Sequence, residues 1–105
     1  HVNFSTKQMR SEGGYEHITR AIENLKLKHS EHLKIYGDDN HLRLTGKHET
    51  SSMDTFTCGI ANRGCSVRIP RQTALNQQGY FEDRRPSSSA DMYLVTSKLF
   101  WTCTH

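Results

Sequence analysis

The residues that most clearly indicate chemistry are arginines gathered between positions 63 and 85. The charged residues of this window are Arg63, Arg68, Arg71, Arg84, Arg85, Glu82 and Asp83, and no lysine is among them. A guanidinium group binds a carboxylate or a phosphate through two parallel hydrogen bonds, which a lysine ammonium cannot do. The window therefore favours an oxyanion site over the alternative, a solvated basic face. Composition alone does not decide between a nucleotide phosphate, a substrate carboxylate and a nucleic-acid backbone.

Two glutamates are candidates for a role beside such an anion. Glu82 lies among the arginines, where it either pairs with one of them, the commoner outcome, or holds a divalent metal that bridges phosphate oxygens. Glu49 follows Gly46-Lys47-His48 and precedes small residues, a pattern that suits a mobile loop carrying an acid–base group. A solvated surface pair is the commoner alternative for Glu49. Position 52 is a serine, which excludes the zinc-protease motif.

Histidines and cysteines give weaker signals. His29 and His32 stand three apart on an expected helix and could share a metal, but no third ligand is in register, so a half-buried helix face is favoured. The three cysteines are Cys58, Cys65 and Cys103. Their odd number and the lack of a CxxC pair indicate neither a disulfide scaffold nor a zinc knuckle. We expect reduced thiols in a cytosolic protein.

These side chains must be positioned by a small α+β fold. Its clearest element is a helix over about residues 15–36, because apolar side chains recur every three or four positions and Gly37 ends the run. The expected apolar face consists of Ile18, Ile22, Leu25, His29, Leu33 and Tyr36. Residues 1–10 open with polar–apolar alternation and predict a strand that leads into a turn.

A second strand signal lies within the arginine window. Val67 and Ile69 alternate with Arg68 and predict a strand that carries Arg68 on its other face and is closed by Pro70. We expect a loop over residues 71–79.

A second helix is expected over about residues 90–103, with Asp91 as its cap. Its apolar stripe is Met92, Val95, Leu99 and Cys103. Together the patterns predict two amphipathic helices over a mostly antiparallel set of strands.

The composition is unusually polar for a chain of 105 residues. Leu, Ile, Val and Phe make up about 19% of it, close to the level typical of disorder, but the net charge of +3 is small. No apolar run approaches the ~20 residues of a membrane span, and the length suits one domain. The first residue is His1 and no signal segment follows, so we expect a processed or truncated chain. On these grounds a polar small domain and a piece of a larger one are equally favoured.

Four segments, taken together and in order, resemble the catalytic domain of glutamine synthetases of the eukaryotic type. They are His1-Val2-Asn3-Phe4-Ser5-Thr6-Lys7, Arg43-Leu44-Thr45-Gly46-Lys47-His48-Glu49-Thr50-Ser51, Ala61-Asn62-Arg63 with Ser66-Val67-Arg68-Ile69-Pro70-Arg71, and Gly79-Tyr80-Phe81-Glu82-Asp83-Arg84-Arg85-Pro86. The resemblance covers nearly the whole chain and implies that the chain is the carboxyl-terminal part of that catalytic domain. It shifts the balance to a fragment, residues 1–105, without the family's amino-terminal domain.

The resemblance implies a role for individual residues. The implied metal ligands are His1 and Glu82. The implied ATP contacts are Asn3, Phe4, Ser5, Arg63, Arg68, Tyr80, Phe81 and Glu82. The implied glutamate-binding residues are Arg43, Arg63 and Arg84. The implied catalytic residues are Glu49, as a flap that closes over the site, and Arg63, between the γ-phosphate and the glutamate.

The resemblance also implies a reaction, in which glutamine forms from glutamate, ammonium and ATP through γ-glutamyl phosphate. Mg²⁺ or Mn²⁺ is the implied cofactor, because metals and arginines offset the repulsion between carboxylate and triphosphate. It further implies a homo-oligomeric ring with active sites between subunits, a cytoplasmic location, and neither nucleic-acid nor membrane partners. We expect the fragment alone to hold a partial site with little or no ligase activity.

Two other function classes stay open at this stage. One is a non-catalytic relative or truncation product with a role in assembly or regulation. The other is a small nucleic-acid-binding module with Tyr80 and Phe81 as stacking rings, although no RNP, KH or zinc-finger pattern supports it.

Overall fold

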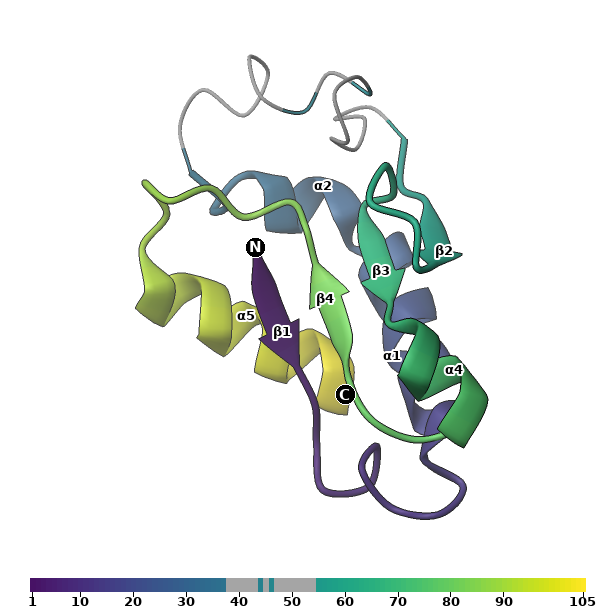
Figure 1. The fold of residues 1–105 in the computed structure, drawn as a ribbon. Helices are drawn as coiled ribbons and strands as arrows, with labels where there is room; N and C mark the ends of the chain where they lie inside the picture. Colours follow the sequence, from purple (N-terminus) through teal and green to yellow (C-terminus); the bar gives the residue numbers. More distant parts are fainter. Residues whose placement is uncertain (38–43, 45, 47–54) are drawn as a thin grey trace.

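The structure, a computed structural model of the chain, describes residues 1–37, 44, 46 and 55–105. Its elements are β1 (Val2–Phe4), α1 (Gly14–Leu27), α2 (His29–Leu33), β2 (Cys58–Ile60), β3 (Val67–Ile69), α4 (Arg71–Asn76), β4 (Phe81–Asp83) and α5 (Met92–Thr104) (Figure 1). The strands form one four-stranded sheet with the order β1-β4-β3-β2. None of the helices within these residues is long and apolar enough to cross a membrane.

The centre of the sheet is β4, which joins the first residues of the chain to the arginine window. It pairs antiparallel with β1, with Asn3 opposite Glu82, and antiparallel with β3, with Arg68 opposite Glu82. The sheet therefore places three sequence-distant polar residues in one row across adjacent strands.

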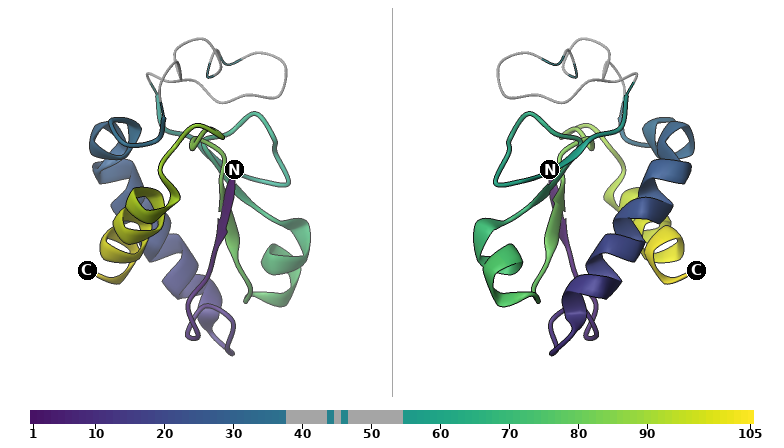
Figure 2. Two further views of the ribbon diagram at one scale, coloured as in Figure 1. Left: turned by 90° about the vertical axis from the view of Figure 1, so that its left-hand side faces the viewer. Right: turned by 90° about the vertical axis from the view of Figure 1, so that its right-hand side faces the viewer.

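The two faces of the sheet differ sharply, because alternate residues of a strand point to opposite sides. Val67, Ile69 and Phe81 are buried in one core with residues of α1 and α5. Figure 2 shows both helices on the same side of the sheet. Full burial of one such apolar side chain stabilises the fold by roughly 1.5–3 kcal/mol. The polar row lies on the opposite face.

The expectation of mostly antiparallel strands is correct for two of the three pairings and wrong for the third. β2 pairs parallel with β3, with Cys58 opposite Val67. The loop 61–66 carries the chain back along β2, so that β3 starts level with the start of β2. It begins at Ala61, in the left-handed region at φ 54°, and it folds over Gly59, where a Cβ would lie 2.8 Å from the Cys65 sulfur.

The first expected helix is broken and a further helix replaces an expected loop. A single residue, Lys28, leaves helical geometry at φ −108° and ψ 19° and separates α1 from α2. Residues 71–76 of the expected loop form α4, which starts directly after Pro70. In α4 only Thr73 is buried, so no apolar periodicity signalled this helix.

The second helix is confirmed, as is its cap. The carboxylate of Asp91 accepts hydrogen bonds from the backbone N–H groups of Tyr93 and Leu94. Val95 and Leu99 are fully buried, as the stripe predicted. Met92 is 48% exposed, because it lies in the first turn, before the helix meets the core.

Candidate functional site

The polar face of the sheet gathers three residues around the carboxylate of a fourth, Glu82. Glu82 Oε1 accepts a hydrogen bond from Arg68 Nε at 3.0 Å and another from Arg84 Nη1 at 2.8 Å. Its second oxygen, Oε2, lies 4.0 Å from Nδ1 of His1. We call these residues, His1, Arg68, Glu82 and Arg84, the Glu82 cluster.

The cluster is partly shielded from water, which strengthens its electrostatics. The side chains of Glu82 and Arg84 are 14% and 9% exposed. Burial raises the pKa of Glu82, but hydrogen bonds and charge from Arg84 and Arg68 outweigh it and hold the pKa below its usual range. Glu82 is therefore ionised at neutral pH, and its two arginines bring a net positive charge to this face.

The donor atoms at this face fit part of a divalent-metal site. A carboxylate oxygen and an imidazole nitrogen are ligands that Mn²⁺ accepts, and Mg²⁺ commonly takes one or two protein carboxylates beside water and phosphate oxygens. Glu82 Oε2 and the half-exposed His1 ring face each other in this way. Within the described residues, no three His, Cys, Asp or Glu side chains come together as a metal cluster.

A small cavity opens beside the cluster, along the strand β1 that follows His1. Its volume is about 220 Å³ and it is lined by Asn3, Phe4, Ser5, Arg10, Gly79 and Tyr80. This is below the roughly 300–1,000 Å³ of pockets that enclose drug-sized ligands, so it suits a flat ring system with the rest of the ligand outside. Asn3 links the two sites, since it lines the cavity and pairs with Glu82 across the sheet.

The wall of this cavity depends on a glycine. Gly79 has a φ of 144°, and a Cβ at this position would lie 2.5 Å from the Thr73 hydroxyl oxygen. Another residue would be strained here and would push the chain away from α4. The cavity therefore owes its shape to the turn between α4 and β4.

Arg10 is a cavity residue that the sequence did not single out. Its Nη1 donates to the Ser5 hydroxyl at 2.6 Å, and its backbone carbonyl accepts from the Gln78 amide at 2.9 Å. The composition argument missed it because it lies far from the arginine window. The available signal was its spacing, five residues after Ser5 in the turn that follows β1.

The remaining candidates are dispersed. Phe81 is fully buried on the helix side of the sheet, with its ring 5.6 Å from that of Phe4, so its side chain does not line the cavity. Arg63 lies exposed in the loop between β2 and β3. The candidates Arg43 and Glu49 lie outside the described residues.

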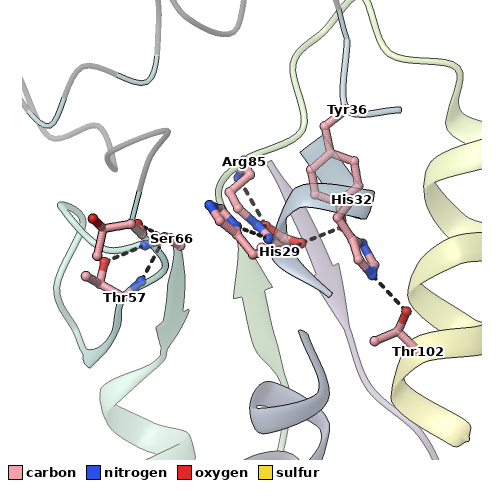
Figure 3. Close-up of polar contacts among 9 residues, drawn as sticks. His29, His32, Tyr36, Thr57, Ser66, Arg85 and Thr102 are labelled. Atoms are coloured by element: carbon pink, nitrogen blue, oxygen red, sulfur yellow. Dashed lines mark hydrogen bonds and ion pairs between the residues drawn. The ribbon is translucent and has the colours of Figure 1, made fainter. Parts of the chain in front are cut away.

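The two helix histidines face separate partners rather than a shared metal (Figure 3). His29 Nδ1 lies 2.7 Å from Arg85 Nη1. His32 is fully buried between Tyr36 and Thr102. The prediction of a half-buried helix face is confirmed for His29, whereas the His32 side chain is fully buried.

No protein-family model matches this chain, but individual proteins of one family do. The chain is 59% identical over 99 residues to the glutamine synthetase cytosolic isozyme 1-1 of Oryza sativa, covering 94% of this chain and 28% of that protein. The glutamine synthetase of Yarrowia lipolytica is 59% identical over 96 residues, or 91% and 26% of the two chains. A chloroplastic/mitochondrial glutamine synthetase of Arabidopsis thaliana is 59% identical over 99 residues, or 94% and 23%. The chain spans about a quarter of the length of these relatives, and it belongs to the glutamine synthetase family.

Proposed function

We propose that these residues form part of the active site of an ATP-dependent glutamate–ammonia ligase, within a polypeptide of the length of the relatives. The Glu82 cluster carries the proposal, because it joins a partly buried carboxylate, two arginines and a histidine on one face of the sheet. Such a set suits a reaction between a triphosphate and a carboxylate, whose negative charges must be offset.

The residues of the cavity and of the Glu82 cluster have separate tasks in this proposal. The cavity beside β1 takes the base of ATP, with Asn3, Ser5 and Tyr80 at its wall. The phosphates then extend along the polar row toward Arg68. Arg84, beside Glu82, binds the carboxylate of glutamate. These assignments agree with the order of the residues across the sheet, in which Asn3 and Arg68 flank Glu82.

The divalent metal, Mg²⁺ or Mn²⁺, would be held here by Glu82 Oε2 and His1. When bound, it neutralises phosphate charge and aligns the triphosphate for transfer. Arg68 and Arg84 fix the orientation of the Glu82 carboxylate by holding its other oxygen. Oε2, the oxygen proposed to bind the metal, is thereby turned toward His1.

The assignments that rest on the family resemblance alone complete the proposal. Arg63 lies between the γ-phosphate and glutamate, Arg43 is a second glutamate-binding arginine, and Glu49 closes over the site and holds ammonium. Active sites lie between subunits of a ring. We also propose a cytoplasmic location, since the names of the relatives include cytosolic isozymes beside a chloroplastic/mitochondrial one.

The test measures glutamine formed from glutamate, ammonium and ATP with Mg²⁺ by the full-length protein. Arg63→Ala should lower kcat/KM by at least about a hundredfold, as expected for a group that stabilises transferring charge. Arg71→Ala is the matched control, since Arg71 is an exposed arginine of the same window and has no assigned role. Parental activity in Arg63→Ala would end the assignment. ATP binding without any glutamine formation by the wild type would favour a non-catalytic relative with a role in assembly or regulation.

A further inference from the structure

Behind the Glu82 cluster lies a second set of polar residues, on the buried face of the same strand. Asp83 and Arg85 alternate with Glu82 and Arg84 along the chain, so they point to the helix side of the sheet. Both side chains are fully buried. Arg85 grips Asp83 at two points, Nε to Oδ1 at 2.9 Å and Nη2 to Oδ2 at 2.8 Å, and its backbone N–H donates to Oδ1 at 3.1 Å.

A chain of hydrogen bonds connects this ion pair to α5. The Tyr36 hydroxyl donates to Asp83 Oδ2 at 2.7 Å. Its oxygen must then accept from His32 Nδ1, 2.6 Å away, which leaves His32 Nε2 to accept from the Thr102 hydroxyl at 2.8 Å. Burial lowers the pKa of His32 to about 4, so the ring is neutral near pH 7, and these contacts then assign it the tautomer protonated on Nδ1. Figure 3 shows His32 between Tyr36 and Thr102.

Arg85 is held from further sides as well. Its Nη1 lies 2.7 Å from His29 Nδ1, and its guanidinium carbon stands 5.0 Å from the centre of the Tyr36 ring and 5.1 Å from that of Phe56. Gly37 lets the chain pass close by, since its φ is 108° and a Cβ there would collide with the Ser87 hydroxyl. The segment after β4 is therefore anchored to α2 and to the residues that follow it.

The anchor matters most for Arg84, which lies just beyond the end of the strand. The strand β4 ends at Asp83, and the backbone N–H of Arg84 makes one more bond, to the Ser66 carbonyl at 2.8 Å. Past this point the ladder with β1 ends, at the pair Val2 and Asp83, and the next contact with the start of the chain is the His1 ammonium group, which donates to the Pro86 carbonyl at 3.4 Å. The tip of the Arg84 side chain is held by Glu82, whose Oε1 accepts from Nη1 at 2.8 Å, while its backbone is held by the buried neighbours on either side, Asp83 and Arg85.

We propose that Asp83, Arg85, Tyr36 and His32 are positioning residues that fix Arg84, and to a lesser degree Glu82, on the site face of the sheet. This inference rests on the proposed function, in which Arg84 binds glutamate. The buried pair cannot shift without separating two desolvated charges, so the segment that carries the site residues is held in one geometry. The expected signature is weakened binding of glutamate with little change in metal dependence.

The experiment measures the KM for glutamate, kcat and the half-saturating Mg²⁺ concentration in the full-length protein. Tyr36→Phe removes one hydroxyl from the network and should raise the KM for glutamate about three- to tenfold, the scale of one typical intramolecular hydrogen bond. Arg85→Lys keeps the charge but loses the two-point grip, and should raise that KM by at least about tenfold. In both variants kcat and the half-saturating Mg²⁺ concentration should stay within about twofold of the wild type, because Glu82 lies inside the strand.

Ile18→Val is the matched control, because Ile18 is fully buried in α1 and lies outside the network. A merely structural loss lowers the active fraction and hence the apparent kcat, leaving the KM for glutamate unchanged, as expected in this control. A wild-type KM for glutamate in Tyr36→Phe and in folded Arg85→Lys would overturn the positioning role. So would an equal rise in Ile18→Val.

The two proposals fail in different ways. A wild-type protein that forms no glutamine overturns the proposed function and this inference with it. A wild-type protein that forms glutamine, together with an inactive Glu82→Ala variant and a Tyr36→Phe variant of unchanged KM, overturns the positioning role alone.

Discussion

Glu82 is the residue on which the site is built, and its surroundings explain why it can be a ligand as well as a partner in an ion pair. Both arginine contacts fall on Oε1, at 3.0 and 2.8 Å. A carboxylate has lone pairs on both oxygens, so Oε2 keeps acceptor capacity toward His1. The sequence left pairing and metal binding as alternatives for Glu82, and the geometry allows the two together.

At the same scale, Arg10 is expected to contribute to nucleotide binding. Its guanidinium is held by the Ser5 hydroxyl at the wall of the cavity that also contains Tyr80. Arg10→Ala should raise the half-saturating ATP concentration of the full-length protein about tenfold, the scale of one cation–π contact between its guanidinium and the bound base. Lys7→Ala, an exposed cation of the same turn, is the control. Equal ATP dependence in the two variants would remove Arg10 from the site.

His32 should make stability depend on pH. Burial, and then the charge of Arg85, lower its pKa to about 4, from 6.5 in the unfolded chain. The folded state therefore favours the neutral ring. This contribution is complete above about pH 6.5 and is lost as the pH falls toward 4, with a magnitude on the order of 3 kcal/mol. Urea unfolding followed by circular dichroism should show this loss in the wild type and a flatter profile in His32→Gln. Parallel profiles would contradict the assignment of a neutral His32.

At the scale of elements, regular patterns with a burial signature could be predicted from the sequence. Val67 and Ile69 alternate with Arg68, and β3 follows this alternation. The core face of α1 is likewise the predicted one, with Ile18, Ile22 and Leu25 buried. These elements are set by the burial of apolar side chains, which periodicity reports directly.

Elements without such a signature escaped prediction. The helix α4 buries a threonine and begins directly after Pro70, so it reflects backbone geometry more than hydrophobicity. The parallel pairing of β2 and β3 depends on how the loop 61–66 folds over Gly59, a tertiary contact. For the same reason the network behind β4 was not foreseen, since His32, Asp83 and Thr102 meet only in the folded chain.

The cap of α5 gives an element-scale test. Asp91 Oδ1 accepts from the N–H of Tyr93 at 2.9 Å and from that of Leu94 at 3.4 Å. Asp91→Ala should lower the free energy of unfolding by about 1 kcal/mol, measured by urea unfolding, while Asp91→Ser should retain most of it. An Asp91→Ala variant as stable as the wild type would show that the cap contributes nothing.

On the scale of the whole molecule, the unusual polarity and the unusual surface have a common explanation. The chain spans about a quarter of its relatives' length. The outer face of α5 exposes large apolar side chains, among them Tyr93 at 86%, Phe100 at 59% and Trp101 at 59%. Such a surface marks a contact face. We expect it to be covered in the full-length protein, while the polar face of the sheet serves the site.

This explanation predicts how the 105 residues behave by themselves. They should self-associate through the outer face of α5, as measured by sedimentation velocity. The double variant Phe100→Lys and Trp101→Lys should reduce this association without loss of helical circular dichroism, because neither side chain belongs to the core. Monomeric wild-type material with a sharp, cooperative melt would contradict the expectation.

The central claim is that these residues supply one side of a metal–nucleotide site, and the metal dependence of the full-length protein tests it most directly. Glutamine formation should be measured against Mg²⁺ and Mn²⁺ concentration in the wild type, in Glu82→Gln, in His1→Ala and in the Arg71→Ala control. The account predicts a half-saturating metal concentration at least about tenfold higher in Glu82→Gln and His1→Ala, with Arg71→Ala unchanged. Identical metal dependence in all four proteins would contradict it.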